Sequence, residues 1–140
     1  MANAIGISRG GRNTKIHALT DDVGRPFALR LTPGNINDNL VAEEIIGSVS
    51  PSKELLADKA YDSDAIRNFL KARQTRAVIP PYKMRTIQYR YSKTAYKGRN
   101  VIERTFCRLK DFRRIAMRFD RRLDVFFSAL CLVATLLWWV

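Results

Sequence analysis

Residues 54–79 read ELLADKAYDSDAIRNFLKARQTRAVI and contain the pattern that decides the fold class. The short apolar run Glu54–Ala57 predicts a strand with Asp58 at its carboxyl end. Asp62-Ser63-Asp64 is typical of a helix start, so a helix should follow it. Ala77–Ile79 predicts a second short strand after that helix. A strand, a helix and a strand in succession are typical of α/β domains.

Upstream of this stretch, the sequence predicts a β-hairpin and then a helix. Thr14–Leu19 and Pro26–Thr32 alternate apolar and polar residues, and Asp21–Gly24 between them is a turn sequence. Asn37 or its neighbour Asp38 can cap a helix that runs to about Ile46. A hairpin followed by alternating strands and helices predicts an α/β fold with one mixed sheet and flanking helices.

Downstream, the sequence predicts an irregular basic stretch and two helices. The irregular part runs from Tyr82 to about Ala95, and a long helix follows from about Tyr96 to Met117. The last segment, Val125–Val140, has 16 residues and no charge. A membrane span needs about 20 apolar residues, so we expect a core helix here. The alternative is a tail anchor, which would pellet with membranes at high salt.

Composition limits the remaining classes of protein. The 140 residues suit one domain, and a hydrophobic content of 46% excludes a fully disordered basic tail. Cys107 and Cys131 form no CxxC pair, which argues against a disulfide scaffold or a cysteine zinc site. A single histidine, His17, is expected to be structural. Residues 1–13 predict a flexible Gly/Arg lead without a signal peptide, so a cytoplasmic location is expected.

The positive charge is concentrated in one segment. Residues 83–122 hold 14 basic and 3 acidic residues, whereas the other 100 residues are almost neutral. Such a segment attracts polyanions, and nucleic acid is the commonest of these in cells. The alternative is a solvated charged face. Three tyrosines of this region can stack on bases or pack on the following helix, namely Tyr82, Tyr89 and Tyr91.

Two acidic residues stand out as candidate metal ligands. Asp58 follows a strand at the edge where open α/β sheets bind ligands, and it lies too far before the next helix to cap it. For Asp62 and Asp64 we favour capping. At about 100° per residue, one helical stripe spanning about 60° contains Tyr96, Arg99, Glu103 and Lys110.

An apolar face adjoins that stripe and consists of Ile102, Phe106, Leu109, Phe112 and Ala116. We therefore expect Glu103 at the margin of the core, either as an ion-pair partner or as a metal ligand. Spacing alone leaves these two roles open.

The pattern Tyr96-x2-Arg99-x3-Glu103-x6-Lys110 resembles the C-terminal signature of bacterial insertion-sequence DDE transposases of the insertion-sequence-four/five type. Three further segments, at 8–18, 31–35 and 55–63, resemble other parts of that family, and the last contains Ala57-Asp58-Lys59. The resemblance covers nearly the whole chain.

This resemblance implies an RNase H-like catalytic domain that cleaves and joins DNA at insertion-element ends. Three carboxylates of such a site hold two Mg2+ (or Mn2+) ions, which clamp a phosphodiester. Carried over by position, Asp58 is the second acid and Glu103 the third, and both are metal ligands. The DNA-binding residues implied are Tyr96, Arg99, Arg104, Lys110, Arg113 and Arg114. The partners implied are element ends, target DNA and a second copy of the chain.

One part of the family pattern has no counterpart. The first acid of such enzymes lies on the central first strand, before the Gly/Arg lead, and residues 1–7 contain no acid. Asp21 and Asp22 fall in the predicted turn. We therefore expect a C-terminal catalytic part, residues 14–140, that lacks the first strand and is inactive alone. It is either the second reading frame of an element, completed by an upstream product, or a truncated copy.

Two other functions fit parts of the sequence. A non-catalytic DNA-binding remnant, or an inhibitor of the full enzyme, needs only the basic segment. A ribosomal-type RNA-binding protein fits the charge but not Ala57-Asp58-Lys59.

Overall fold

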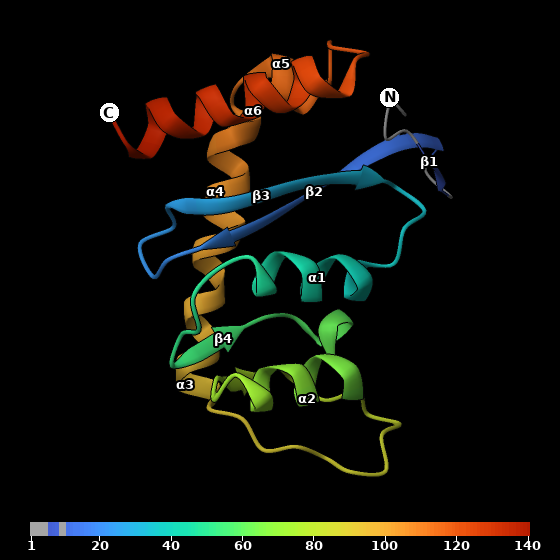
Figure 1. The fold of residues 1–140 in the computed structure, drawn as a ribbon, viewed down its shortest axis with the longest axis vertical. Coiled ribbons are helices and arrows are strands. Elements are labelled where there is room, and N and C mark those ends of the chain that lie inside the picture. The colour runs from blue at the N-terminus through green and yellow to red at the C-terminus, as the bar shows by residue number, and fades with distance from the viewer. Residues whose placement is uncertain (1–5, 9–10) are drawn as a thin grey trace. The chain divides into compact units, whose positions relative to one another are not determined.

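The structure, a computed structural model, describes residues 6–8 and 11–140 (Figure 1). The chain divides into two compact units. One contains the described residues up to Ile36 together with Val101–Val140, and the other contains Asn37–Asn100. Each unit has its own sheet and its own helices, and we describe each by itself.

The first unit is built on a three-stranded antiparallel sheet in the order β1-β2-β3. These strands are β1 (Gly6–Ser8), β2 (Gly11–Thr20) and β3 (Pro26–Pro33). The β2–β3 hairpin closes through the expected turn, where Gly24 has a φ of +90° and donates its N–H to the Asp21 carbonyl. β1 pairs with residues 11–13 of β2, and β3 pairs with residues 14–20 of β2.

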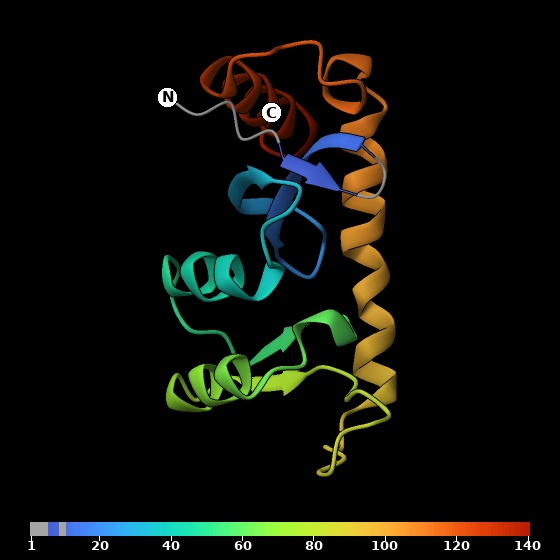
Figure 2. The same ribbon diagram turned by 90° about the vertical axis from the view of Figure 1, so that its right-hand side faces the viewer.

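Three helices complete this unit: α4 (Asn100–Lys110), α5 (Arg113–Ala116) and α6 (Leu123–Trp138). Both views show α5 and α6 at the carboxyl end of α4 (Figures 1 and 2). Their shared core contains fully or almost fully buried apolar side chains, packed against Ile16, Leu29 and Leu31 of the hairpin. The main members are Leu109, Ile115, Phe126 and Leu130. The sheet therefore presents one apolar face to the helices.

The second unit has a parallel pair of short strands, β4 (Glu54–Leu56) and β5 (Arg76–Val78). Between them lie the 3₁₀ turn η1 (Lys59–Tyr61) and the helix α2 (Asp64–Ala72). The unit begins with α1 (Asp38–Gly47) and ends with α3 (Lys93–Tyr96) and the 3₁₀ turn η2 (Lys97–Arg99). Its core comprises Val41, Ala42, Ile45, Ile46, Ile66, Leu70, Val78 and Ile79.

Most local predictions are confirmed. The hairpin, the strand at Glu54 and the helix after Ser63 appear where expected, and Asn37 caps α1 by accepting the Asn39 N–H. The mixed α/β class is confirmed as well, but the strands form two separate ladders rather than one sheet. Each ladder forms through a local connection, a turn in one case and α2 in the other.

Two expectations at the ends of the chain differ from the structure. The stretch expected as a flexible lead contains β1 and the start of β2, while residues 1–5 and 9–10 lie outside the described part. The final helix begins at Leu123, two residues earlier than expected, and Asp124 in its first turn suits the positive end of the helix dipole. Among the described residues, no helix has the length and apolarity to cross a membrane.

The single helix expected from Tyr96 to Met117 was wrong. The segment is helical in pieces, because η2 precedes α4 and Phe112 adopts an extended φ of −83° and ψ of 110°. This break redirects the chain so that Ile115 is buried, whereas Phe112 and Ala116 are exposed. Burial of Ile115 offsets the helical hydrogen bonds lost at the break.

Candidate functional site

Asp58 lies where the sequence predicted, at the carboxyl end of β4. The Ala57 N–H donates to the Val78 carbonyl at 3.4 Å, which extends the β4–β5 ladder up to Asp58. The Asp58 side chain then caps η1, with Oδ1 accepting the Ala60 N–H at 2.8 Å. The carboxylate is half-buried. Asp58 is therefore too far away to cap α2, as expected, but it caps the turn that begins beside it.

Burial and the negative charges of two carboxylates raise the pKa of Tyr61, which follows Asp58 by three residues. Burial, together with the negative charges of Asp38 and Asp58, raises the pKa of Tyr61 to about 12. Tyr61 is consequently a neutral hydrogen-bonding group at physiological pH, and its phenol ring lies in the electrostatic field of Asp58.

A buried ion-pair cluster follows Asp58 by four residues. The Asp62 carboxylate is fully buried and lies 2.7 Å from Arg67 Nε and 3.3 Å from Arg85 Nε. Its Oδ2 also accepts the Tyr82 N–H at 2.8 Å. Arg67 in turn donates from Nη2 to the Ile79 carbonyl at 3.0 Å. This carboxylate therefore joins the start of α2, the end of β5 and the basic stretch that follows.

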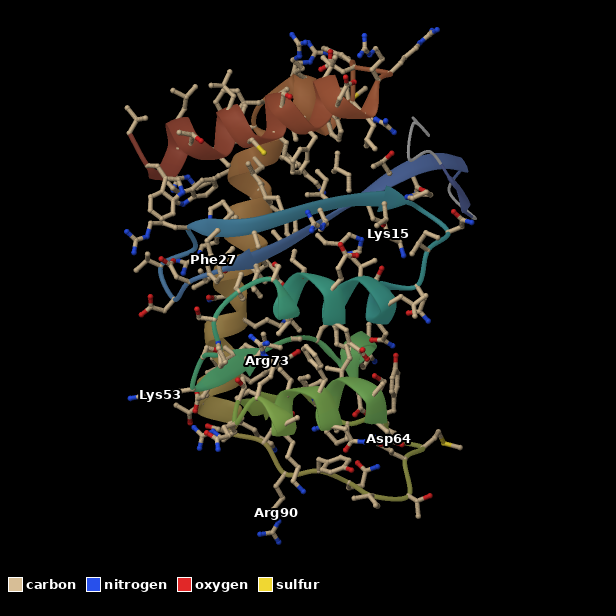
Figure 3. The ribbon with its side chains drawn as sticks, in the orientation of Figure 1. Lys15, Phe27, Lys53, Asp64, Arg73 and Arg90 are labelled. Atoms are coloured by element: carbon tan, nitrogen blue, oxygen red, sulfur yellow. The ribbon has the colours of Figure 1, made fainter. Side chains whose placement is uncertain are left out.

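Asp62-Ser63-Asp64 marks the start of α2 as expected, although neither aspartate is the N-cap. The N-cap of α2 is Ser63, whose Oγ accepts the Ile66 N–H at 3.2 Å. Asp64, labelled in Figure 3, lies in the first turn of α2, where its charge suits the helix dipole. Its carboxylate pairs with Arg85.

The remaining acid of interest, Glu103, is exposed in the first turn of α4 rather than at the margin of the core. The face of α4 that packs inward contains Thr105 and Leu109, with Val101 half-buried above them. The Thr105 hydroxyl donates to the Gly24 carbonyl at 2.8 Å. Glu103 follows Val101 by two residues, which is about 200° around a helix, so it faces the opposite side.

The two candidate metal ligands belong to different units, Asp58 to the second and Glu103 to the first. In the part of the chain that the structure describes, no group of three or more His, Cys, Asp or Glu side chains could hold a metal ion. The carboxylate oxygens of Asp58 and Glu103 are nevertheless suitable ligands for Mg2+, which prefers oxygen. Since a carboxylate offers about four lone-pair sites, Asp58 can accept from Ala60 and still ligate a cation.

The polar stripe predicted on one helix is divided. Tyr96 ends α3 and Arg99 lies in η2, with the Arg99 guanidinium 5.7 Å from the centroid of the Tyr96 ring. A 3₁₀ turn advances about 120° per residue instead of about 100°, so three such residues displace Tyr96 by about 60° from its expected angle. Lys110 is exposed at the end of α4. Tyr96 and Arg99 are thus brought together, within the second unit.

The other basic candidates are exposed, but they are not equivalent. Arg104 and Arg113 are exposed on α4 and α5. Arg114 makes two hydrogen bonds of 2.7 Å to Asp120, and this hydrogen-bonded carboxylate raises the pKa of the Arg114 guanidinium. Arg113 therefore offers its charge to a partner more readily than Arg114 does.

Sequence reasoning missed the role of Tyr89. Its ring lies between two guanidinium groups, 4.1 Å from that of Arg67 and 5.1 Å from that of Arg85. The Tyr89 ring thus packs against Arg67 of the preceding helix α2, a partner that the two expected alternatives, bases and the following helix, do not include. Arg67 precedes Tyr89 by 22 residues, and the four-residue spacing of Arg85 and Tyr89 falls outside any helix, so no periodic signal indicates the cluster.

Comparison with known proteins identifies the family. The family described as "Transposase DDE domain" matches residues 6–139, which is nearly the whole chain. The chain belongs to this family of DDE transposase domains. Its relatives are proteins of bacterial insertion sequences, so the resemblance to insertion-sequence transposases is confirmed and the ribosomal-type alternative is set aside.

Two relatives show how similar the chain is to proteins of insertion sequences. The chain is 33% identical over 135 residues to the "Putative transposase for insertion sequence element IS6501" of Brucella ovis, covering 89% of this chain and 97% of that protein. It is 34% identical over 142 residues to the "Putative transposase for insertion sequence element IS402" of Burkholderia cepacia, covering 94% of this chain but only 65% of that protein. No solved structure matches the chain.

Proposed function

We propose that the chain is the C-terminal part of an RNase H-like catalytic domain that cleaves and joins DNA at insertion-element ends. The observation that carries the proposal is the position of Asp58, at the carboxyl end of a parallel strand and fixed by its own 3₁₀ turn. Ligands of open α/β sheets bind at this edge. The match to the family of DDE transposase domains over residues 6–139 supports the RNase H-like fold.

In this proposal Asp58 and Glu103 are the second and third acids and would hold Mg2+ or Mn2+, with two ions in the complete site. The metal, when bound, supplies an activated water or 3′-hydroxyl and stabilises the leaving oxygen. The chain's own contribution is to fix the Asp58 carboxylate through the Ala60 N–H and to keep Glu103 exposed.

DNA would be bound by the basic segment, residues 83–122. Arg104, Lys110 and Arg113 are exposed and can reach phosphate oxygens directly. The Arg99 guanidinium lies 5.7 Å from the centroid of the Tyr96 ring, and a guanidinium of this kind suits phosphate oxygens. Arg114 would need to exchange Asp120 for a phosphate. Since the proposed substrate is bacterial DNA, we place the activity in the cytoplasm.

By itself, this 140-residue chain should be inactive. No acid precedes Asp21, and the Asp21 carboxylate already accepts hydrogen bonds from Val23 and Arg25 within its turn. A first acid would then come from the product of an upstream reading frame, and a truncated copy would have none. Assembly with a second copy of the chain belongs to the same proposal.

A plasmid-nicking assay tests whether the chain is inactive by itself and becomes active with an upstream-frame product. Purified chain with Mg2+ should leave supercoiled plasmid intact, and addition of an upstream-frame product that supplies an acid should restore nicking. Metal-dependent nicking by the chain alone, lost in both Asp58→Ala and Glu103→Ala, would contradict its inactivity.

The second candidate function is a non-catalytic DNA-binding remnant or an inhibitor of the complete enzyme. It is favoured by the exposed basic side chains of Arg104, Lys110 and Arg113, because binding to DNA phosphates needs neither acid. Here Asp58→Ala should leave every measurable activity intact, whereas Arg113→Glu with Arg114→Glu should abolish DNA binding. If Asp58→Ala instead removes plasmid nicking in the assay that contains the upstream-frame product, the catalytic function holds.

A further inference from the structure

A tight turn at the start of the basic stretch is held by its own hydrogen bonds. The Arg85 N–H donates to the Tyr82 carbonyl at 3.1 Å, which closes a four-residue turn. The Gln88 side-chain amide donates to the Tyr82 carbonyl at 2.9 Å and to that of Arg85 at 2.7 Å. It also lies 3.4 Å from the Lys83 carbonyl. Gln88 thus binds the turn from its inner side.

Both ends of the same turn are anchored to residues 62–64, at the start of α2. Its first residue, Tyr82, donates its N–H to the fully buried Asp62 carboxylate at 2.8 Å. Its last residue, Arg85, pairs with Asp62 and Asp64 and lies against the Tyr89 ring. A buried carboxylate has few alternative partners, so this anchorage restrains the turn.

The restrained turn presents an apolar apex among basic side chains. Met84 is 96% exposed and Ile87 is 62% exposed. Lys83 and Arg90 are also exposed, and Figure 3 shows the Arg90 side chain extending away from the loop and from α2. One exposed apolar residue is ordinary on a protein surface. Here it occupies the apex of a doubly anchored turn, where it contributes nothing to the packing of the free protein.

We propose that Met84 and Ile87 form an apolar wedge that enters a base step of duplex DNA, while Lys83 and Arg90 bind the flanking phosphates. Methionine and isoleucine are among the side chains that unstack base steps in this way. A wedge has to be held rigidly, because a flexible loop would lose ordering entropy on insertion, and the Asp62 anchorage supplies that rigidity. Flexible pyrimidine–purine steps are the favoured sites. This inference rests on the proposed DNA binding.

The test measures unstacking and affinity separately. The full chain is titrated into a short duplex with the fluorescent base 2-aminopurine at a TA step, and affinity is measured at several salt concentrations. Binding by the unsubstituted chain should raise the fluorescence. Met84→Ala should remove that rise and weaken binding roughly tenfold, because the gain from inserting the side chain is lost. Lys83→Ala should keep the rise and reduce the salt slope by about 0.9.

Met117→Ala is the matched control, since Met117 is 63% exposed in the same basic segment but has no comparable anchored turn. It should bind and unstack like the unsubstituted chain. An equal fluorescence rise in Met84→Ala, or salt-dependent binding without any rise in the unsubstituted chain, would overturn the wedge but not DNA binding. Absence of duplex binding altogether would overturn the proposed function as well.

Discussion

The Asp62 carboxylate and the Arg67 guanidinium, five residues apart, form an ion pair of 2.7 Å with the carboxylate fully buried and the arginine side chain 9% exposed. This pair lies between the loop that positions Asp58 and the turn that presents Met84. The turn that presents Met84 therefore depends on this one carboxylate.

Replacing Asp62 should destabilise the protein strongly. Asp62→Ala leaves two arginines and the Tyr82 N–H without their shared acceptor, and breaking a buried pair costs roughly 3–5 kcal/mol. Urea unfolding followed by circular dichroism measures the loss. Asp64→Ala is the control, because its side chain is 74% exposed and should change the free energy of unfolding by less than about 1 kcal/mol. Equal effects of the two substitutions would contradict the role of Asp62.

Gly24 should not tolerate a side chain. Its φ of +90° disfavours other residues, and an added Cβ would lie 2.8 Å from Thr105 Oγ1 and 3.0 Å from Val101 Cγ1. Gly24→Ala should cost about 1–3 kcal/mol in thermal or urea unfolding. Gly98→Ala is matched to it, because there the nearest atom is Leu56 Cδ2 at 3.4 Å and φ is ordinary, so the cost should stay below about 1 kcal/mol. A stable Gly24→Ala protein would contradict the close hairpin–helix approach.

Arg113 and Arg114 should contribute unequally to DNA affinity. Arg113→Ala should lower the slope of log affinity against log salt by about 0.9, whereas Arg114→Ala should lower it less. The reason is that Asp120 already compensates the Arg114 charge. Asp120→Asn should tighten binding by releasing Arg114. Equal salt slopes for the two alanine variants would contradict this, because they would mean that the Asp120 pair does not reduce the contribution of Arg114 to phosphate binding.

Acid should weaken the hairpin through Asp21. Burial raises the pKa of its carboxyl, but hydrogen bonds from Arg25 and Val23 outweigh it and leave the pKa below the ordinary 3.8. A lowered pKa in the folded state means that the carboxylate stabilises the protein above pH of about 4 and loses this effect as the pH falls further. Asp21→Asn should therefore lose less stability between pH 5 and pH 3 than the unsubstituted chain, measured by urea midpoints. Asp22→Asn, with the same change of charge in the same turn, should retain the full loss.

The elements with local signals could be predicted from the sequence. The hairpin has alternating residues and a Gly-containing turn, and α1 and α2 have side-chain caps at Asn37 and Ser63. The break at Phe112 could not be predicted, because no proline or glycine marks it. It depends on the burial of Ile115 and on the Arg114–Asp120 pair, which are contacts of the folded chain.

The candidate site could be predicted only where a local sequence signal marks a residue. Asp58 follows a strand, so its place could be derived from the chain order alone. The exposure of Glu103 was missed because the predicted apolar face included Phe112 and Ala116, which follow the end of α4 and are exposed. The Asp62 cluster joins residues up to 23 positions apart, from Asp62 to Arg85, and no periodicity marks such a set.

The cap formed by Asp58 has an evolutionary consequence. An asparagine at that position would keep an oxygen for the Ala60 N–H, so the turn and the unit around it would fold unchanged while the negative charge disappeared. Under the proposed function, a copy of the element with this single change would still produce a folded protein able to occupy DNA. Selection for folding would not remove it, and such copies would persist in a genome as competitors of active ones.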